Sequence, residues 1–248
     1  MMLRRSGMVA RVLAIALALG TTGAVLSSGS ASAGIEARQA AATSATSADL
    51  QPADAPPGDG IVAGYWVDSV TRIAKLGSNL TVPRGRFDAL VKSTGTLRGN
   101  LTLPAAKGYF VTFGIMPVTS TVELIPDGEA TGTVKIVPGE HGLAADADVT
   151  AKILIALKDV RVDGVPLDAG PGCRTRIPAS IRIKGVLGLT PEAPPTEVVS
   201  TFDMPSFSGC GVREDLDRVL SGLVSGPGNE LRTTLSIRCI TREVCEAG

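Results

Sequence analysis

The sequence contains one histidine, His141, and any chemistry that needs an imidazole base must use it. In Ser-His-Asp or Cys-His catalysis this ring takes the proton of a nucleophile and is held in place by a third group. His141 stands in the run Pro138–Gly142, which is typical of an exposed turn. The sequence has no Gly-x-Ser-x-Gly elbow to supply a nucleophile. We therefore expect no catalytic residue.

Acidic residues form two further candidate sites. Asp146 and Asp148 are two positions apart, so both would point to the same face of a strand. Glycosidases need two carboxyl groups about 5–9 Å apart around a sugar, yet aromatic residues make up only 3% of this chain. These acids, or the turn Asp127–Glu129, could bind calcium, but the sequence lacks EF-hand spacing. We interpret all of them as solvated turn residues and expect neither a metal nor a cofactor.

The cysteines all lie in the C-terminal third of the chain, at Cys173, Cys210, Cys239 and Cys245. Such a set suits an oxidising environment and allows three disulfide pairings. We favour Cys173–Cys210 together with Cys239–Cys245. A zinc site is the alternative, but the sequence has no Cys-x-x-Cys pair and its histidine lies far upstream.

Residues 1–33 are typical of a secretory signal peptide that is cleaved. A positive start precedes a short apolar run and a small-residue exit: Arg4, Arg5 and Arg11, then Val12–Leu19, then Ala31-Ser32-Ala33. The apolar run is shorter than the ~20 residues that a spanning helix needs. A retained membrane anchor and twin-arginine export are therefore the less favoured alternatives. Residues 34–60 are rich in Ala, Ser and Pro without periodicity, and they predict a disordered spacer.

Residues 61–248 predict a single β-rich domain, because apolar residues recur at every second position. Four such runs are Ser120/Val122/Leu124, Val149/Ala151/Ile153/Ile155/Leu157, Ile181/Ile183 and Leu231/Thr233/Leu235/Ile237. Asp163-Gly164 is a candidate type I′ hairpin turn. We expect an all-β fold, an antiparallel sandwich or barrel of about ten strands.

One amphipathic helix is expected near the C-terminus. Its apolar face would be formed by Leu216, Val219, Leu220 and Leu223. Gly226-Pro227 would end it, so Gly226–Asn229 follows a helix and is not a phosphate loop that opens one. We expect this helix to plug one end of the β structure or to pack across its face.

The charge balance limits the partners. Without the leader the chain has 21 basic and 24 acidic residues, a net charge of −3. Nucleic acids and anionic membranes attract clustered Lys and Arg, and no such cluster is present in the sequence. We expect no nucleic-acid partner and no transmembrane span, and consider a lipid or another cell-envelope component as the ligand.

Several stretches resemble an uncharacterised family of secreted actinobacterial β-rich proteins. They are Thr71–Gly77, Gly95–Pro104, the neighbourhoods of Cys173 and Cys210, and Ser225–Asn229. The resemblance covers most of residues 64–237 and transfers no functional residue, since the family has no assigned activity. It implies a bacterial secreted origin and supports the Cys173–Cys210 pair.

Three functions are consistent with these observations. The first is a secreted, non-catalytic β protein of the cell surface or medium that acts by binding or as an envelope component. The second is a carrier of an apolar ligand such as a lipid, and the third is an exported hydrolase. The feature that separates the first two is whether the inward faces fill the core or line a cavity.

We predict that signal peptidase cleaves after Ala33, because the Ala-Ser-Ala pattern ends there. N-terminal sequencing of protein recovered from the medium should begin at Gly34 or within a few residues of it. Recovery only in the membrane fraction, with the leader intact, would contradict the prediction.

Overall fold

A computed structural model describes residues 60–242 and 244–245. The predicted signal peptide and the predicted spacer up to residue 59 lie outside the described residues. Gly60, which we assigned to the spacer, is the first residue of a strand. Within the described residues, no helix has the length and apolar character needed to cross a bilayer.

The all-β class predicted from the sequence is confirmed. Thirteen strands form one antiparallel sheet, accompanied by a single short helix. The strands are β1 (Gly60–Ile73), β2 (Ser78–Lys92), β3 (Thr96–Thr102), β4 (Ala106–Thr112), β5 (Met116–Pro126), β6 (Ala130–Gly139), β7 (Gly142–Val162), β8 (Val165–Pro166), β9 (Arg174–Thr175), β10 (Ala179–Gly188), β11 (Thr196–Met204), β12 (Phe207–Ser208) and β13 (Gly226–Thr241). Ten of them have seven residues or more, which is the number expected; β8, β9 and β12 have two each.

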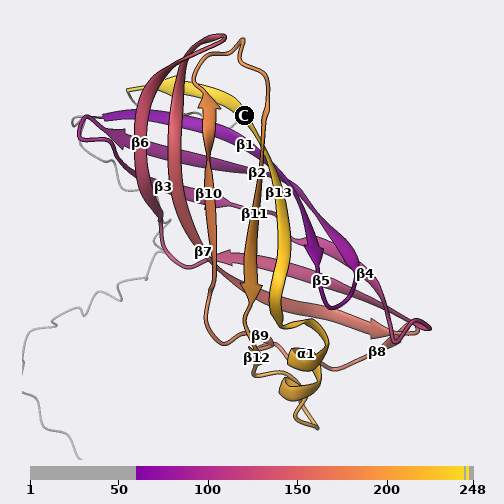
Figure 1. Ribbon diagram of the computed structural model, residues 1–248. Coiled ribbons are helices and arrows are strands. Elements are labelled where there is room, and N and C mark those ends of the chain that lie inside the picture. Colours follow the sequence, from indigo (N-terminus) through magenta and orange to yellow (C-terminus); the bar gives the residue numbers. More distant parts are fainter. Residues whose placement is uncertain (1–59, 243, 246–248) are drawn as a thin grey trace, which may run out of the picture. The chain divides into compact units, whose positions relative to one another are not determined.

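The sheet curls so that β11, at one end of the strand order, comes beside β10. Its strand order runs β11-β13-β1-β2-β3-β6-β7, and β10 pairs with the far edge of β7. β10 and β11 also run side by side, as Figure 1 shows. Thr196 Oγ1 on β11 donates a hydrogen bond of 3.5 Å to the carbonyl of Val186 on β10. One face of the sheet is thereby enclosed and becomes the core.

The 21-residue strand β7 organises this sheet. Thr150 pairs with both β6 and β10, whereas Ile153 pairs with both β5 and β10. β5 and β6 therefore occupy the same edge of β7, one after the other. The turn between them is tied to β7 by the N–H of Asp127, which donates to the carbonyl of Lys152 at 2.8 Å. At this turn the sheet divides, because β6 continues to β3 while β5 continues to β4.

The alternating residues face the core as predicted. Val149, Ile153 and Ile155 of β7 are buried, and Lys152 and Lys158 are exposed. The alternation changes phase at Asp159, which has φ +50°, where the register with β5 also shifts. Before this bulge the core-facing residues of β7 are odd-numbered, whereas after it the even-numbered Val160 and Val162 face the core.

The predicted type I′ turn is also present, because Asp163 and Gly164 both have positive φ.

The helix α1 (Asp217–Val224) lies at the end of the sheet that also carries β9 and β12 (Figure 1). Leu220 is buried against the main hydrophobic cluster. Asp217 accepts a hydrogen bond from the N–H of Cys210 at 2.7 Å, and Lys75 Nζ donates to the carbonyl of Gly222 at 3.1 Å. The helix thus joins the Cys210 loop to the β1–β2 turn. Ser225 caps its end, and Gly226-Pro227 already belongs to β13.

Both disulfides have the connectivity favoured from the sequence. Cys173 is bonded to Cys210, 37 positions away, and Cys239 to Cys245, six positions away. Cys173 and Cys210 are both buried in the main core cluster. The first bridge therefore connects the segment between β8 and β9 to the segment between β12 and α1.

We predict that the Cys173–Cys210 bridge stabilises the fold more than Cys239–Cys245 does. Loop-closure entropy gives about 4 kcal/mol for the longer loop and about 2 kcal/mol for the shorter one. The double variant Cys173→Ala/Cys210→Ala should lower the thermal midpoint by several degrees more than Cys239→Ala/Cys245→Ala does. Calorimetry of the two variants tests this, and equal losses would contradict it.

Candidate ligand-binding cavity

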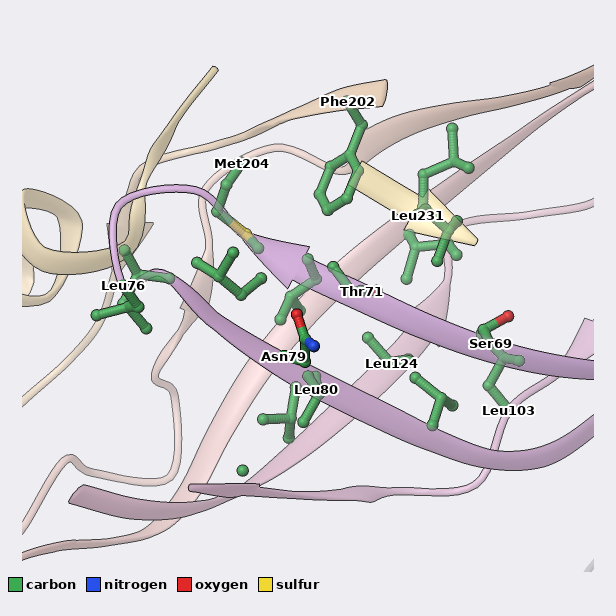
Figure 2. Close-up of a pocket in the computed structure, with 18 of the residues that line it drawn as sticks. Ser69, Thr71, Leu76, Asn79, Leu80, Leu103, Leu124, Phe202, Met204 and Leu231 are labelled. Atoms are coloured by element: carbon green, nitrogen blue, oxygen red, sulfur yellow. The ribbon is translucent and has the colours of Figure 1, made fainter. Parts of the chain in front are cut away.

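A cavity of about 340 Å³ lies inside the curled sheet. Its walls are formed by side chains of the long strands and of α1. Figure 2 shows Phe202, Met204 and Leu231 on one side of this space and Leu80 and Leu124 on the other. None of the described residues that line it carries a formal charge. The cavity is therefore an apolar chamber.

The room arises where small residues occupy inward positions. Ala147 and Ala151 alternate with Val149 and Ile153 along β7, and all four line the cavity. An alanine at such a position leaves space that the facing side chains do not fill. Ala151 is only half-buried although it lies mid-strand, because it borders this space.

Polar side chains are a minority of the lining, and three of their hydroxyls are hydrogen-bonded within the wall. Ser69 Oγ and Thr233 Oγ1 lie 3.4 Å apart, and Thr112 Oγ1 donates to the carbonyl of Met116 at 3.2 Å. These bonds satisfy three hydroxyls within the wall and so reduce the number of unpaired polar groups that face the cavity. Pairing of this kind is expected, since an unpaired buried hydroxyl costs about 1–3 kcal/mol.

Ser120 differs from these three residues. Its side chain is 5% exposed and its Oγ has no hydrogen-bond partner there. It lies opposite Gly108 in the β4–β5 pairing, and a Cβ at position 108 would come within 2.9 Å of that oxygen. The glycine therefore makes room for a hydroxyl that the fold itself leaves unsatisfied.

The cavity reaches the surface at one end of the sheet. Five of its lining residues are exposed: Tyr109, Phe113 and Met116 of the β4–β5 hairpin, Val219 of α1, and Asn79 at the start of β2. We place the entrance between this hairpin, the start of β2 and α1 because these residues are both wall and surface.

A second hollow, of about 1060 Å³, lies toward the other end of the core. It shares Phe87, Ala147, Val149 and Leu187 with the first, so these side chains separate the two. Its lining also includes Lys92, Lys135 and Arg242. A water-exposed, charged rim makes it a poorer chamber for an apolar molecule despite its larger volume.

Tyr65 stands in the wall of this second hollow. Its hydroxyl donates a hydrogen bond of 3.1 Å to the carbonyl of Gly188. Burial raises the pKa of Tyr65 to about 12, because the phenolate would lose its hydration. The bond joins β1 to the end of β10, and so ties opposite walls of the core.

Asn229 fastens the end of the sheet next to the cavity. It is buried, and its Oδ1 accepts the N–H of Ala74 at 3.1 Å. Its Nδ2 donates to the carbonyls of Phe202 and Gly226 at 3.2 and 2.8 Å. The Gly226–Asn229 run therefore joins the β1–β2 turn to β11 and β13, which is a structural role.

The residues that first suggested catalysis are not brought together. His141 is exposed in the turn between β6 and β7, and its backbone carbonyl accepts a hydrogen bond from Thr190 Oγ1 at 2.7 Å. Its imidazole forms no ion pair or hydrogen bond with the described residues. In the same part of the chain, no group of three His, Cys, Asp or Glu side chains is arranged to hold a metal ion.

The interpretation of Asp146 and Asp148 as turn residues is wrong. Both lie within β7, since the turn before it is shorter than we assumed. Asp148 forms an ion pair with Arg182 of β10, and the hydrogen bonds from this guanidinium lower the pKa of the carboxyl group. Asp146 and Asp148 are therefore strand residues whose side chains lie on one face of the sheet. Asp127-Gly128 does form a turn, with φ +82° at the glycine.

Comparisons with protein-family models, with curated proteins and with solved structures found no match for this chain. The resemblance to secreted actinobacterial proteins therefore stays a prediction.

Sequence reasoning missed the residues of the entrance. Phe113 and Ile115 flank Gly114 in a stretch, Tyr109–Val118, that contains no charged residue. A turn flanked by large apolar residues is unusual, and that signal could have drawn attention to it. By contrast, the period-2 pattern did place Ser120 on the face of Val122 and Leu124, which is where it lies.

We predict that Tyr65 titrates about two pH units above an exposed tyrosine. The chain has two tyrosines, so the variant Tyr109→Phe leaves Tyr65 as the remaining one. Phenolate absorbance of this variant should rise with a midpoint near pH 12. Because the folded pKa is raised above the unfolded value of 10.0, this contribution to stability is complete below pH 10 and declines as the pH rises toward 12. A midpoint near pH 10 in the folded protein would contradict the burial of this phenol.

Proposed function

We propose that this protein is an exported, non-catalytic carrier of an apolar ligand such as a lipid, which it holds inside the curled sheet. The observation that carries the proposal is the chamber of about 340 Å³ whose described lining residues are uncharged and mainly apolar. Ligand pockets have volumes of ~300–1,000 Å³. An apolar cavity of about 150 Å³ already binds benzene, and this one has more than twice that volume.

The lining also supports binding in preference to hydrolysis. Several serines face the cavity, but a serine nucleophile needs a general base within hydrogen-bond reach. The described lining contains neither a histidine nor an acid, and His141 lies in an exposed turn elsewhere. An exported hydrolase is therefore the less favoured function.

Ser120 suggests the class of apolar ligand. A bound molecule that carries one hydroxyl, carbonyl or carboxyl group can satisfy Oγ once the side chain turns toward the cavity. Such a bond is worth about 0.5–1.5 kcal/mol, while the rest of the affinity comes from burying methylene groups at ~0.8 kcal/mol each. We propose a single-chain lipid with one small polar group.

We predict that the protein binds a fluorescent long-chain fatty acid and that Ala151→Phe weakens this binding. The larger side chain fills space that the ligand would occupy, and losing two buried methylenes weakens binding about tenfold or more. Fluorescence titration measures the affinity, and calorimetry should show a thermal midpoint that is unchanged or raised, because the cavity has room for the ring.

His141→Ala is the matched control, since this exposed residue lies outside the cavity lining. Its affinity for the fatty acid should equal that of the unmodified protein. Failure of the unmodified protein to bind the fatty acid, or equal binding by Ala151→Phe, would contradict the proposal.

A further inference from the structure

The β4–β5 hairpin ends in a group of exposed apolar residues, which we call the apolar tip: Tyr109, Val111, Phe113, Ile115 and Met116. Phe113 is 79% exposed and Ile115 is 83% exposed. Their side chains therefore contribute little to the packing of this chain. Val165 of β8 is also exposed. It lies beside the tip because the N–H of Asp163 donates to the carbonyl of Pro117 at 2.8 Å and so holds the two hairpins together.

The backbone of the tip makes the choice of phenylalanine unusual. The N–H of Ile115 donates to the carbonyl of Thr112 at 3.2 Å, so Phe113 and Gly114 are the central residues of a turn. They have φ of +53° and +73°. Such turns favour Asn, Asp or Gly, and a bulky residue at positive φ is strained. Neither local conformation nor packing within the chain explains Phe113.

We infer that the apolar tip inserts into a lipid surface, with zwitterionic headgroups sufficient for binding. This inference rests on the proposed function, because the tip is continuous with the chamber: Tyr109, Phe113 and Met116 line the cavity as well as facing outward. An apolar chain that leaves a bilayer along these side chains reaches the chamber without crossing water. Burial of apolar side chains at the headgroup boundary supplies the binding energy.

The distribution of charge favours an uncharged lipid surface over an anionic one. No charged residue occurs between Tyr109 and Val118. Behind the tip the charges are of both signs. Asp163 and Arg161 lie beside Pro117 and Thr119 of β5. Further along, Lys107 donates to Thr121 at 2.7 Å and Thr121 donates to Asp159 at 3.0 Å. The basic and acidic groups are therefore mixed and present no cationic patch. Binding should therefore be insensitive to salt, unlike attraction to anionic lipid.

Flotation with phosphatidylcholine vesicles tests the inference. The unmodified protein should float with the vesicles at low and at high salt. Ile115→Asp should reduce the bound fraction to about a tenth or less, since a charge replaces an apolar side chain that the lipid surface would bury. Val199→Asp is the matched control: Val199 is 49% exposed on β11, pairs with Arg232 and lies outside the cavity lining, so this variant should float normally.

A second variant separates loss of binding from loss of folding. Phe113→Asn should also abolish flotation, yet it should raise the thermal midpoint, because asparagine tolerates positive φ. Equal flotation of Ile115→Asp, Phe113→Asn and the unmodified protein would overturn the inference. So would dimerisation that depends on the tip when vesicles are omitted, measured by analytical ultracentrifugation, because the tip would then bind a second copy.

The fatty-acid titration in vesicle-free buffer keeps the two proposals distinguishable. Ile115 does not line the cavity, so Ile115→Asp should bind the soluble fatty acid with the affinity of the unmodified protein. Tip-dependent flotation without fatty-acid binding would leave the lipid-surface inference standing and reject the carrier. Fatty-acid binding without flotation would retain the carrier and reject the lipid surface.

Discussion

The fold depends on the double pairing of β7, a strand hydrogen-bonded along both edges for most of its length. β10 occupies one edge, while β6 and then β5 occupy the other. Because the partner changes at Asp127–Glu129, the sheet beyond that edge divides into one part through β3 and another through β4. The two parts share one central strand and so enclose a common interior. A filled core would need large side chains at the point of division, and β7 places Ala147 and Ala151 nearby.

The cavity is thus a product of curvature combined with small residues. Close packing normally leaves few voids in a protein interior, and an empty apolar space loses the dispersion contacts its walls would otherwise make. A chain that keeps such a space, with an unsatisfied hydroxyl at Ser120, retains two costs in the same place. A bound apolar ligand with one polar group, as proposed above, would offset both. Asn229 and the Cys173–Cys210 bridge stabilise the surrounding elements, which must hold their positions when the interior is not filled.

Local signals predicted the parts of the fold that depend on local physics. Inward and outward residues of β5, β7, β10 and β13 follow from the two-residue repeat of a strand, and positive φ at Asp163-Gly164 follows from turn geometry. His141 was predicted in an exposed turn for the same reason, and it lies there. Asp148 shows the limit: its sequence position suggested a turn, but its carboxylate bonds Arg182 on β10, 34 positions away. No local pattern contains a partner at that separation.

The sequence by itself determined the all-β class, the approximate number of long strands and the faces that are buried. This is possible because the alternation of apolar and polar residues along a strand can be read directly from the sequence. Only the tertiary structure decided whether those faces fill their interior. A cavity is the difference between the volume that the curled sheet encloses and the volume of its side chains, and the enclosed volume depends on register and curvature across strands distant in sequence. The same holds for the apolar tip. Phe113 is an ordinary aromatic residue in the sequence, and its strain, its exposure and its place at the cavity entrance exist only in the folded chain.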